Sequence, residues 1–309
     1  MAIKGKRVLI SLLNSIYDLM PLQKNCFFKL IDAKIVPILL YGSEIWGLQR
    51  HECIERVHTY ACKRFLSVPQ FTCNVPVMGD CRRFPLHIYA CKRAVRYWIR
   101  IINMPNHRYV YKCYIMLKSL DSVGYINWVT HLKRHLQANG FGYVWESQSI
   151  PNIKCFMSEY VHRLQDQYIQ IWSSYCVNSS KLQCYSVFKQ NFVTEPYANF
   201  LTIRKFRSIY ARFRASSHNL AIERGRYENI DRNARVCKHC NHSVETEYHF
   251  LLVCPLYVDL RQQYIDSKFS INPNLDKFNS LMSCNNESIV KDTAQYLYYA
   301  FERRHRTFE

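Results

Sequence analysis

Glycine and acidic side chains are both scarce in this chain. Only 8 of its 309 residues are glycine, and the tight turns of β-hairpins depend on residues that tolerate positive φ. Few such turns can therefore be built, which argues against a fold made of short hairpins. No apolar run reaches the roughly 18 residues that a membrane span requires, so we expect no membrane partner. The scarcity of glycine favours helices, and we predict a mainly α fold.

The deficit of acid leaves the chain strongly basic. Lysine and arginine number 42 against 23 aspartates and glutamates, a formal net charge of +19. From Cys81 to Arg108 there is no acid at all. Such a surface attracts polyanions, because each neutralised phosphate releases condensed counterions. RNA or DNA is the partner that this predicts, although a basic surface without a partner would have the same composition.

Cysteine is abundant, with 14 residues, but it is spread through a long aromatic-rich chain that has enough apolar residues for a core without disulfides. We interpret most of these cysteines as small buried hydrophobic residues in a reducing compartment. The expected location is therefore intracellular, in the nucleus, the cytoplasm or both.

The amino terminus resembles a signal peptide only superficially. Leu9, Leu12, Leu13 and Ile16 recur at helical spacing, and no small-residue cleavage site follows before Pro21. An amphipathic helix is the better interpretation. Residues 139–152, rich in glycine, serine and asparagine, are typical of a loop or seam, and the last stretch from Ala294 predicts a helix with a charged end.

Apolar stripes at helical spacing carry the remaining helix predictions. Ile88, Val95, Ile99 and Ile102 mark one helix face, and Phe206, Ile209, Tyr210 and Phe213 mark another. Cations fall on other faces of the same two segments, so we predict that these basic helices bind nucleic acid. The candidate contacts are Lys92, Arg96, Arg100, Arg204, Lys205, Arg207, Arg212 and Arg214. Tyr89, Tyr97 and Trp98 could stack on bases, but aromatic residues at this spacing are more often core.

One short segment has the spacing of a metal site. Cys237, Cys240, His249 and Cys254 form the pattern C-x2-C-x8-H-x4-C, and three thiolates with one imidazole make a closed tetrahedral zinc site of the structural kind. On a continuous helix His249 and Cys254 would lie about 140° apart. Pro255 resolves this, because it disfavours helical backbone at the preceding cysteine. We therefore expect a short helix from about Thr246 that breaks before Cys254.

Two alternatives to this ligand set stay open. His239 or His242 could replace His249 as the imidazole ligand. In a chain with 14 cysteines and 12 histidines, Cys240 and Cys254 could also be core residues with no metal between them.

The stretch FRASSHNLAIERGRYENIDRNARVCKHCNHSVETEYHFLLVCPLYVDLR, residues 213–261, resembles the carboxy-terminal region of the reverse transcriptases of non-LTR (LINE-type) retrotransposons. The matching segments are Ser217 to Arg226, Arg235 to Cys240, Glu245 to Tyr257, and Arg261. Residues 35–47 and 127–145 resemble, more loosely, the thumb of those proteins and a segment between thumb and zinc knuckle.

The resemblance implies a helical thumb-and-linker bundle with a small CCHC zinc knuckle that holds one structural Zn²⁺ through Cys237, Cys240, His249 and Cys254. It divides the chain into a thumb-like helical segment (1–66), a helical linker region (67–180) and a carboxy-terminal helical region (181–309) with the knuckle at 237–254. RNA, DNA and the rest of such a reverse transcriptase are the partners it implies.

The departure from the family concerns catalysis. A reverse transcriptase holds two metal ions with a Tyr/Phe-x-Asp-Asp motif, and no Asp-Asp pair occurs in this sequence. An endonuclease domain is also missing, so we expect no enzyme activity from this chain by itself. The expected function is nucleic-acid binding. The alternatives are a zinc-stabilised helical scaffold for protein contacts and a relic of a transposable element without function.

Overall fold

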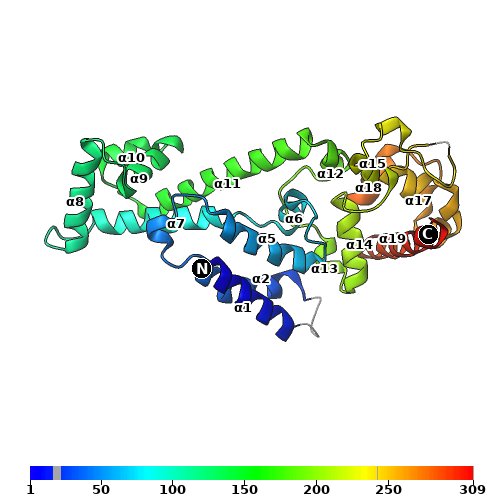
Figure 1. The fold of residues 1–309 in the computed structure, drawn as a ribbon, viewed down its shortest axis with the longest axis horizontal. Coiled ribbons are helices and arrows are strands. Elements are labelled where there is room, and N and C mark those ends of the chain that lie inside the picture. The colour runs from blue at the N-terminus through cyan, green and yellow to red at the C-terminus, as the bar shows by residue number, and fades with distance from the viewer. Residues whose placement is uncertain (17–21, 242, 309) are drawn as a thin grey trace. The chain divides into compact units, whose positions relative to one another are not determined.

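The structure is a computed structural model that describes residues 1–16, 22–241 and 243–308. For residue 308 it describes the backbone alone. The described chain is mainly helical, as predicted (Figure 1). Within these ranges the one pairing of β type is an isolated antiparallel bridge between Val236 and Val244. His242, one of the alternative metal ligands, lies outside the described residues.

The chain groups into two compact units, each made of segments that are distant in sequence. The first contains residues 1–11, 31–58 and 84–171, and the second contains 12–30, 59–83 and 172–309. The three-part division expected from the sequence, with boundaries after residues 66 and 180, does not coincide with this grouping and stays a prediction.

The helices of the first unit are most of α1 (Ala2–Ser15), α3 (Val36–Leu39), α4 (Ser43–Trp46), α7 (Leu86–Ile102), α8 (Tyr109–Ser122), α9 (Trp128–Ala138), α10 (Gly142–Ser147) and most of α11 (Ile153–Asn178). The expected amphipathic helix at the amino terminus is confirmed as α1, with Leu9 and Leu13 buried. The loop expected at 139–152 is wrong in its middle, because α10 forms there and buries Val144 and Trp145.

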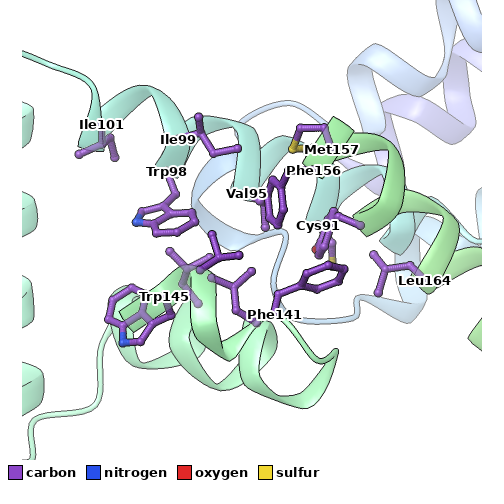
Figure 2. Packing of buried hydrophobic residues seen from close by; sticks show 14 of the residues in the cluster. Cys91, Val95, Trp98, Ile99, Ile101, Phe141, Trp145, Phe156, Met157 and Leu164 are labelled. Carbon is purple, nitrogen blue, oxygen red and sulfur yellow. The ribbon is translucent and has the colours of Figure 1, made fainter. Parts of the chain in front are cut away.

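Helix α7 runs through the core of the first unit. Its predicted apolar face is confirmed for Ile88, Val95 and Ile99, which are buried together with side chains from α9, α10 and α11 (Figure 2). Trp98 is fully buried, donates to the hydroxyl of Tyr114 at 3.1 Å and stacks on Trp145. It is therefore a core residue, unavailable for stacking on a base.

The second unit holds most of α2 (Lys24–Lys34), the second half of α5 (Glu52–Leu66), α6 (Asn74–Cys81), η2 (Ser180–Leu182), α12 (Gln183–Phe188), α13 (Tyr197–Phe200), α14 (Arg204–Arg214), α15 (Ala221–Tyr227), η3 (Arg232–Ala234), η4 (His249–Val253), η5 (Pro255–Tyr257), α16 (Val258–Tyr264), α17 (Ser267–Ser270), α18 (Leu275–Met282) and α19 (Glu287–Phe308). The predicted carboxy-terminal helix is confirmed as α19. Helix α14 packs against it, and Phe213, Phe250 and Phe301 meet between them.

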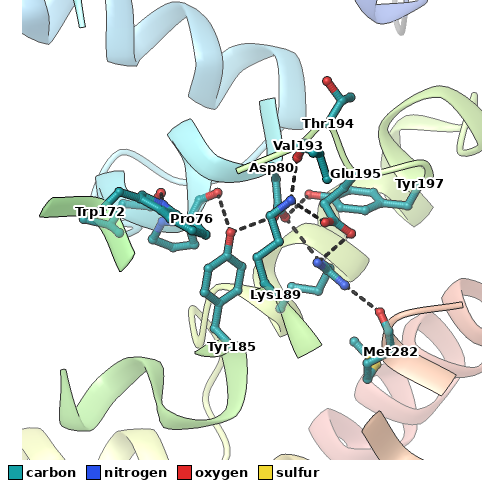
Figure 3. A network of polar contacts seen from close by, with 12 residues as sticks. Pro76, Asp80, Trp172, Tyr185, Lys189, Val193, Thr194, Glu195, Tyr197 and Met282 are labelled. Carbon is teal, nitrogen blue, oxygen red and sulfur yellow. Dashed lines mark hydrogen bonds and ion pairs between the residues drawn. The ribbon is translucent and has the colours of Figure 1, made fainter. Parts of the chain in front are cut away.

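A buried polar network surrounds Arg214, the last residue of α14 (Figure 3). Arg214 pairs with Asp80 at 3.3 Å and with Glu195 at 2.7 Å, and it donates to the carbonyl of Met282 at 2.7 Å. Tyr185 and Tyr197 donate to the two oxygens of Asp80. Burial by itself would lower the pKa of Arg214, but the Glu195 and Asp80 charges raise it well above its ordinary value, so the guanidinium stays charged inside the protein.

Arg214→Ala should lower the free energy of unfolding by about 3–5 kcal/mol, because it leaves the buried carboxylate of Asp80 without its cation and Glu195 with Lys189 alone. Arg96→Ala is the matched control, since Arg96 is exposed and such changes usually stay within about 0.5 kcal/mol. Urea unfolding followed by far-ultraviolet circular dichroism measures both. Equal midpoints for the two variants would contradict the central role of this network.

Candidate metal centre and basic groove

A small turn presents the first two cysteines. The Cys237 amide donates to the carbonyl of Ser243 at 2.8 Å, and the Glu245 amide donates to that of Arg235 at 2.9 Å. Between the two hydrogen-bonded segments the chain reverses direction, and the Asn241 amide donates to the Cys237 carbonyl at 2.9 Å. Asn241 has φ +54°, a conformation that asparagine tolerates better than most residues. The turn brings the sulfurs of Cys237 and Cys240 to one side.

A single π-helical turn presents the other two residues. The Cys254 amide donates to the carbonyl of His249 at 2.8 Å, an i→i+5 bond that makes the two residues neighbours one turn apart. The break expected before Pro255 is confirmed, because Cys254 has extended backbone with φ −56° and ψ 126°. The π turn is the detail that spacing alone did not reveal, since an α-helix would separate the two side chains.

Three of the four side chains, those of Cys237, Cys240 and His249, converge into one group, and Cys254 lies beside Cys237. The ligand atoms of Cys237, Cys240 and His249 all lie within 4.8 Å of one another. Cys254 Sγ lies 3.8 Å from Cys237 Sγ, and Cys240 Sγ lies 3.6 Å from His249 Nε2. Bonds of about 2.3 Å to sulfur and 2.0–2.1 Å to nitrogen place tetrahedral ligand atoms roughly 3.8 Å and 3.6 Å apart. The group could therefore hold a metal ion, and both distances fit a tetrahedral site.

The sulfurs of Cys237 and Cys254 shift each other's pKa. Interaction with the Cys254 sulfur lowers the pKa of Cys237 to about 3, and the same interaction raises the pKa of Cys254. The lowered pKa of Cys237 favours its thiolate, the form that binds metal. His239 is exposed and does not belong to the group, so His249 is the imidazole that the fold brings to the cysteines.

The other residues of the 213–261 segment act as the frame of this group. Glu245 is buried, pairs with Arg304 through two contacts of 2.8 Å and accepts from the Ala221 amide. Arg261 donates to the carbonyl of Cys254 at 2.6 Å, and Arg235 donates to that of Ile222 at 2.8 Å. Each of these contacts ties one part of the metal group to a neighbouring helix or turn.

Gly225 belongs to the same frame. A Cβ at this position would come within 2.7 Å of the Arg235 side chain. The Arg235 side chain can therefore pack against α15 only because residue 225 is glycine. The sequence pattern predicted a basic helix at residues 201–214, but it gave no sign that Arg235 and Arg261 bond to the backbone around the metal group.

The cations of α14 are largely used inside the protein. The expectation that Arg207 and Arg214 lie on an exposed face with Arg204 is wrong, because both are buried. Arg207 donates to the carbonyls of Leu201, Leu22 and Phe65. Arg212 is half-buried and donates to Ser217, and Lys205 lies 4.3 Å over the ring of Tyr298. A helix whose arginines serve the core offers little to a polyanion.

The cations of α7 are placed differently. Lys92 and Arg96 line a groove of about 630 Å³ between α7 and α11, together with Lys154 and His162. The same two cations line a second hollow of about 230 Å³ with Tyr89, Val36 and Leu40. They therefore form a ridge with a hollow on each side, and Arg100 continues the exposed row one helical turn further.

No acid faces this ridge in the described part of the chain. Neither hollow is lined by aspartate or glutamate, and Lys92, Arg96 and Lys154 form no salt bridge with a described residue. Arg93 is the exception among the nearby cations, since it is fixed on the carbonyl of Leu40 at 2.8 Å. Sequence reasoning found Lys92 and Arg96 from their spacing, but it missed Lys154, because nothing in the sequence indicates that α11 packs beside α7.

None of the helices in the described ranges combines the length and the apolar character that crossing a membrane requires.

His249→Ala should weaken metal binding by more than the roughly 100-fold that losing an outer partner of a ligand costs, whereas His239→Ala should leave it unchanged. Titration of the apoprotein with Co²⁺, followed by its thiolate absorption band, measures both variants against the unaltered chain. Equal affinities for the two variants would remove His249 from the ligand set.

Comparison with known proteins gives no further guide, since no family model, no curated protein and no solved structure matches this chain.

Proposed function

We propose that this chain binds nucleic acid through the ridge and groove of α7 and α11, and that one structural zinc ion stabilises its carboxy-terminal region. The groove carries the proposal, because Lys92, Arg96 and Lys154 line one hollow that contains no carboxylate. Cations without acidic partners are free to neutralise phosphates, and counterion release then drives binding.

Zinc is the ion that we assign to the metal group. Three thiolates and one imidazole are soft and borderline ligands that suit Zn²⁺, and a group with four protein ligands leaves no open position for catalysis. Thiolate ligands also require reduced thiols, so the proposed location is intracellular. The Cys237–Cys254 and Cys240–His249 distances support this assignment.

We further propose that the chain corresponds to the carboxy-terminal region of a non-LTR retrotransposon reverse transcriptase and does not itself polymerise. The support comes from the resemblance of residues 213–261. Several residues of that stretch, among them Gly225, Arg235, Glu245 and Arg261, meet around one metal group. In this reading the ridge holds RNA or DNA, and the rest of such a reverse transcriptase is a partner.

Reversing the charge of Lys92, Arg96 and Lys154 to glutamate should weaken binding of a single-stranded RNA at low salt. It should also lower the slope of log affinity against log salt concentration by about two, since each phosphate contact contributes about 0.7. Fluorescence anisotropy at several salt concentrations gives both values.

The matched control reverses Arg50, Lys291 and Arg306, which are solvent-accessible and already paired with Glu52, Glu287 and Glu302. It changes the net charge by the same amount at other places. If both triple variants lose the same affinity, binding depends on overall charge and the groove is not the site.

A second candidate is a scaffold for protein contacts, and α8 is the observation that favours it. Tyr109, Met116 and Val123 follow one another at seven-residue spacing and are 85%, 56% and 69% exposed. Such a stripe suits a partner helix. Arg108 and Lys112 are also exposed on this helix, so the complementary partner is an amphipathic helix with acidic flanks.

Under this alternative, a helical peptide with leucines at that spacing and glutamates beside them should bind the chain, and Met116→Glu should weaken it at least about tenfold through burial of an unpaired charge. Isothermal titration calorimetry measures both. Cys155→Ser, at an exposed position on α11, should have no effect, and failure of the peptide to bind would exclude α8 as the contact surface.

A further inference from the structure

A hollow of about 410 Å³ lies in the second unit beside the metal group and outside the sites described above. Its walls come from η2, α12, α15, η3, α18 and the segment Thr246–Tyr248. That segment leads directly into His249, so the metal group fixes one wall. The volume falls within the roughly 300–1,000 Å³ of small-molecule sites.

A buried carboxylate in this wall has one oxygen without a partner. Glu223 is 2% exposed, and its Oε1 accepts from Arg226 Nε at 2.8 Å. Its Oε2 receives no hydrogen bond from any residue that the structure describes. Buried carboxylate oxygens normally have a donor, so Glu223 offers an acceptor to a ligand. Glu247, the other carboxylate of the wall, is already bonded to Ser216 and His218.

The sides of the hollow suit a flat apolar group. Val187, Ile222 and Leu275 contribute aliphatic surface. The ring of Tyr248 meets that of Phe278 edge to face, with centroids 6.0 Å apart, and its hydroxyl is fixed on the carbonyl of Pro273 at 2.9 Å. These walls suit an aromatic ring, and Glu223 offers an acceptor in the same hollow.

Positive charge without carboxylate partners completes the lining. Arg232 is exposed and hydrogen-bonds to Gln183 Oε1, and Lys181 is half-buried. Among the described residues neither forms a salt bridge, whereas Arg226 is neutralised by Glu223. An anionic group on the ligand would find Lys181 and Arg232 beside it.

We propose that this hollow binds one nucleotide whose base carries an amino group, with that group donating to Glu223 and the phosphate lying against Lys181 and Arg232. Cytosine, adenine and guanine have such a group, whereas the one ring N–H that uracil can donate lies between two carbonyl oxygens that would face the carboxylate, so the site discriminates against uracil. The choice of a nucleotide rests on the proposed function. The same chemistry fits a free nucleotide and a base turned out of a bound single strand.

The test compares CMP, GMP, AMP and UMP, and then single-stranded RNA, on the zinc-loaded full chain by equilibrium dialysis. CMP, GMP and AMP should bind at least about tenfold more tightly than UMP. In Glu223→Gln the Arg226 contact keeps the amide oxygen at the Oε1 position, so the amide nitrogen replaces the free acceptor with a donor. This variant should lose the preference and favour UMP, which presents carbonyl oxygens.

The double variant Lys181→Ala, Arg232→Ala should weaken the binding of all four nucleotides alike and remove the advantage of CMP over cytidine. This variant keeps the test valid if Glu223→Gln fails to fold. Lys154→Glu in the groove should weaken RNA without changing CMP. A preference for C-rich over U-rich RNA that Glu223→Gln abolishes would indicate a base of the bound strand, and CMP binding without that preference would indicate a free nucleotide.

RNA that binds through the groove while no monophosphate binds, or while Glu223→Gln changes nothing, would overturn the nucleotide site and leave the proposed function standing. Nucleotide binding without RNA binding would overturn the groove instead. Absence of both would reject both.

Discussion

The second unit depends on the burial of one guanidinium. Arg214 lies between Asp80 and Glu195 and also reaches the carbonyl of Met282, so a single side chain joins positions from residue 80 to residue 282. A buried ion pair is favourable only when its geometry and further hydrogen bonds offset the loss of water. Tyr185 and Tyr197 supply those bonds to Asp80. The network therefore specifies which segments meet, more than it adds to stability.

The metal group also depends on buried charged side chains that hold separate segments of the chain together. Its four side chains lie on a turn and on one π-helical turn, neither of which has the length to be stable alone. Glu245, Arg261 and Arg304 hold these pieces by contacts to their backbone and to one another. The group is thus surrounded by charged residues with structural roles, which explains why a basic, cysteine-rich stretch folds into a defined site.

The two units use their positive charge differently. In the second unit arginines bond to carbonyls and carboxylates of the core, and Arg207 and Arg214 are buried. In the first unit Lys92 and Arg96 remain beside hollows without acid. A net charge of +19 is therefore a poor guide to where a polyanion binds, because a cation attracts phosphate only where the protein has not already neutralised it.

The sequence by itself determined the helical class, the buried face of α7 and the group of Cys237, Cys240 and His249 that could hold a metal ion. Helical periodicity, the C-x2-C pair and the effect of Pro255 on Cys254 are local features, so they can be recognised from residues that are close in the sequence. Only the tertiary structure decided that Arg214 is buried, that Lys154 joins Lys92 and Arg96, and that a π turn aligns His249 with Cys254. These outcomes depend on partners distant in the sequence or on one extra residue in a helical turn. Neither the distant partners nor the extra residue can be predicted from a local sequence pattern.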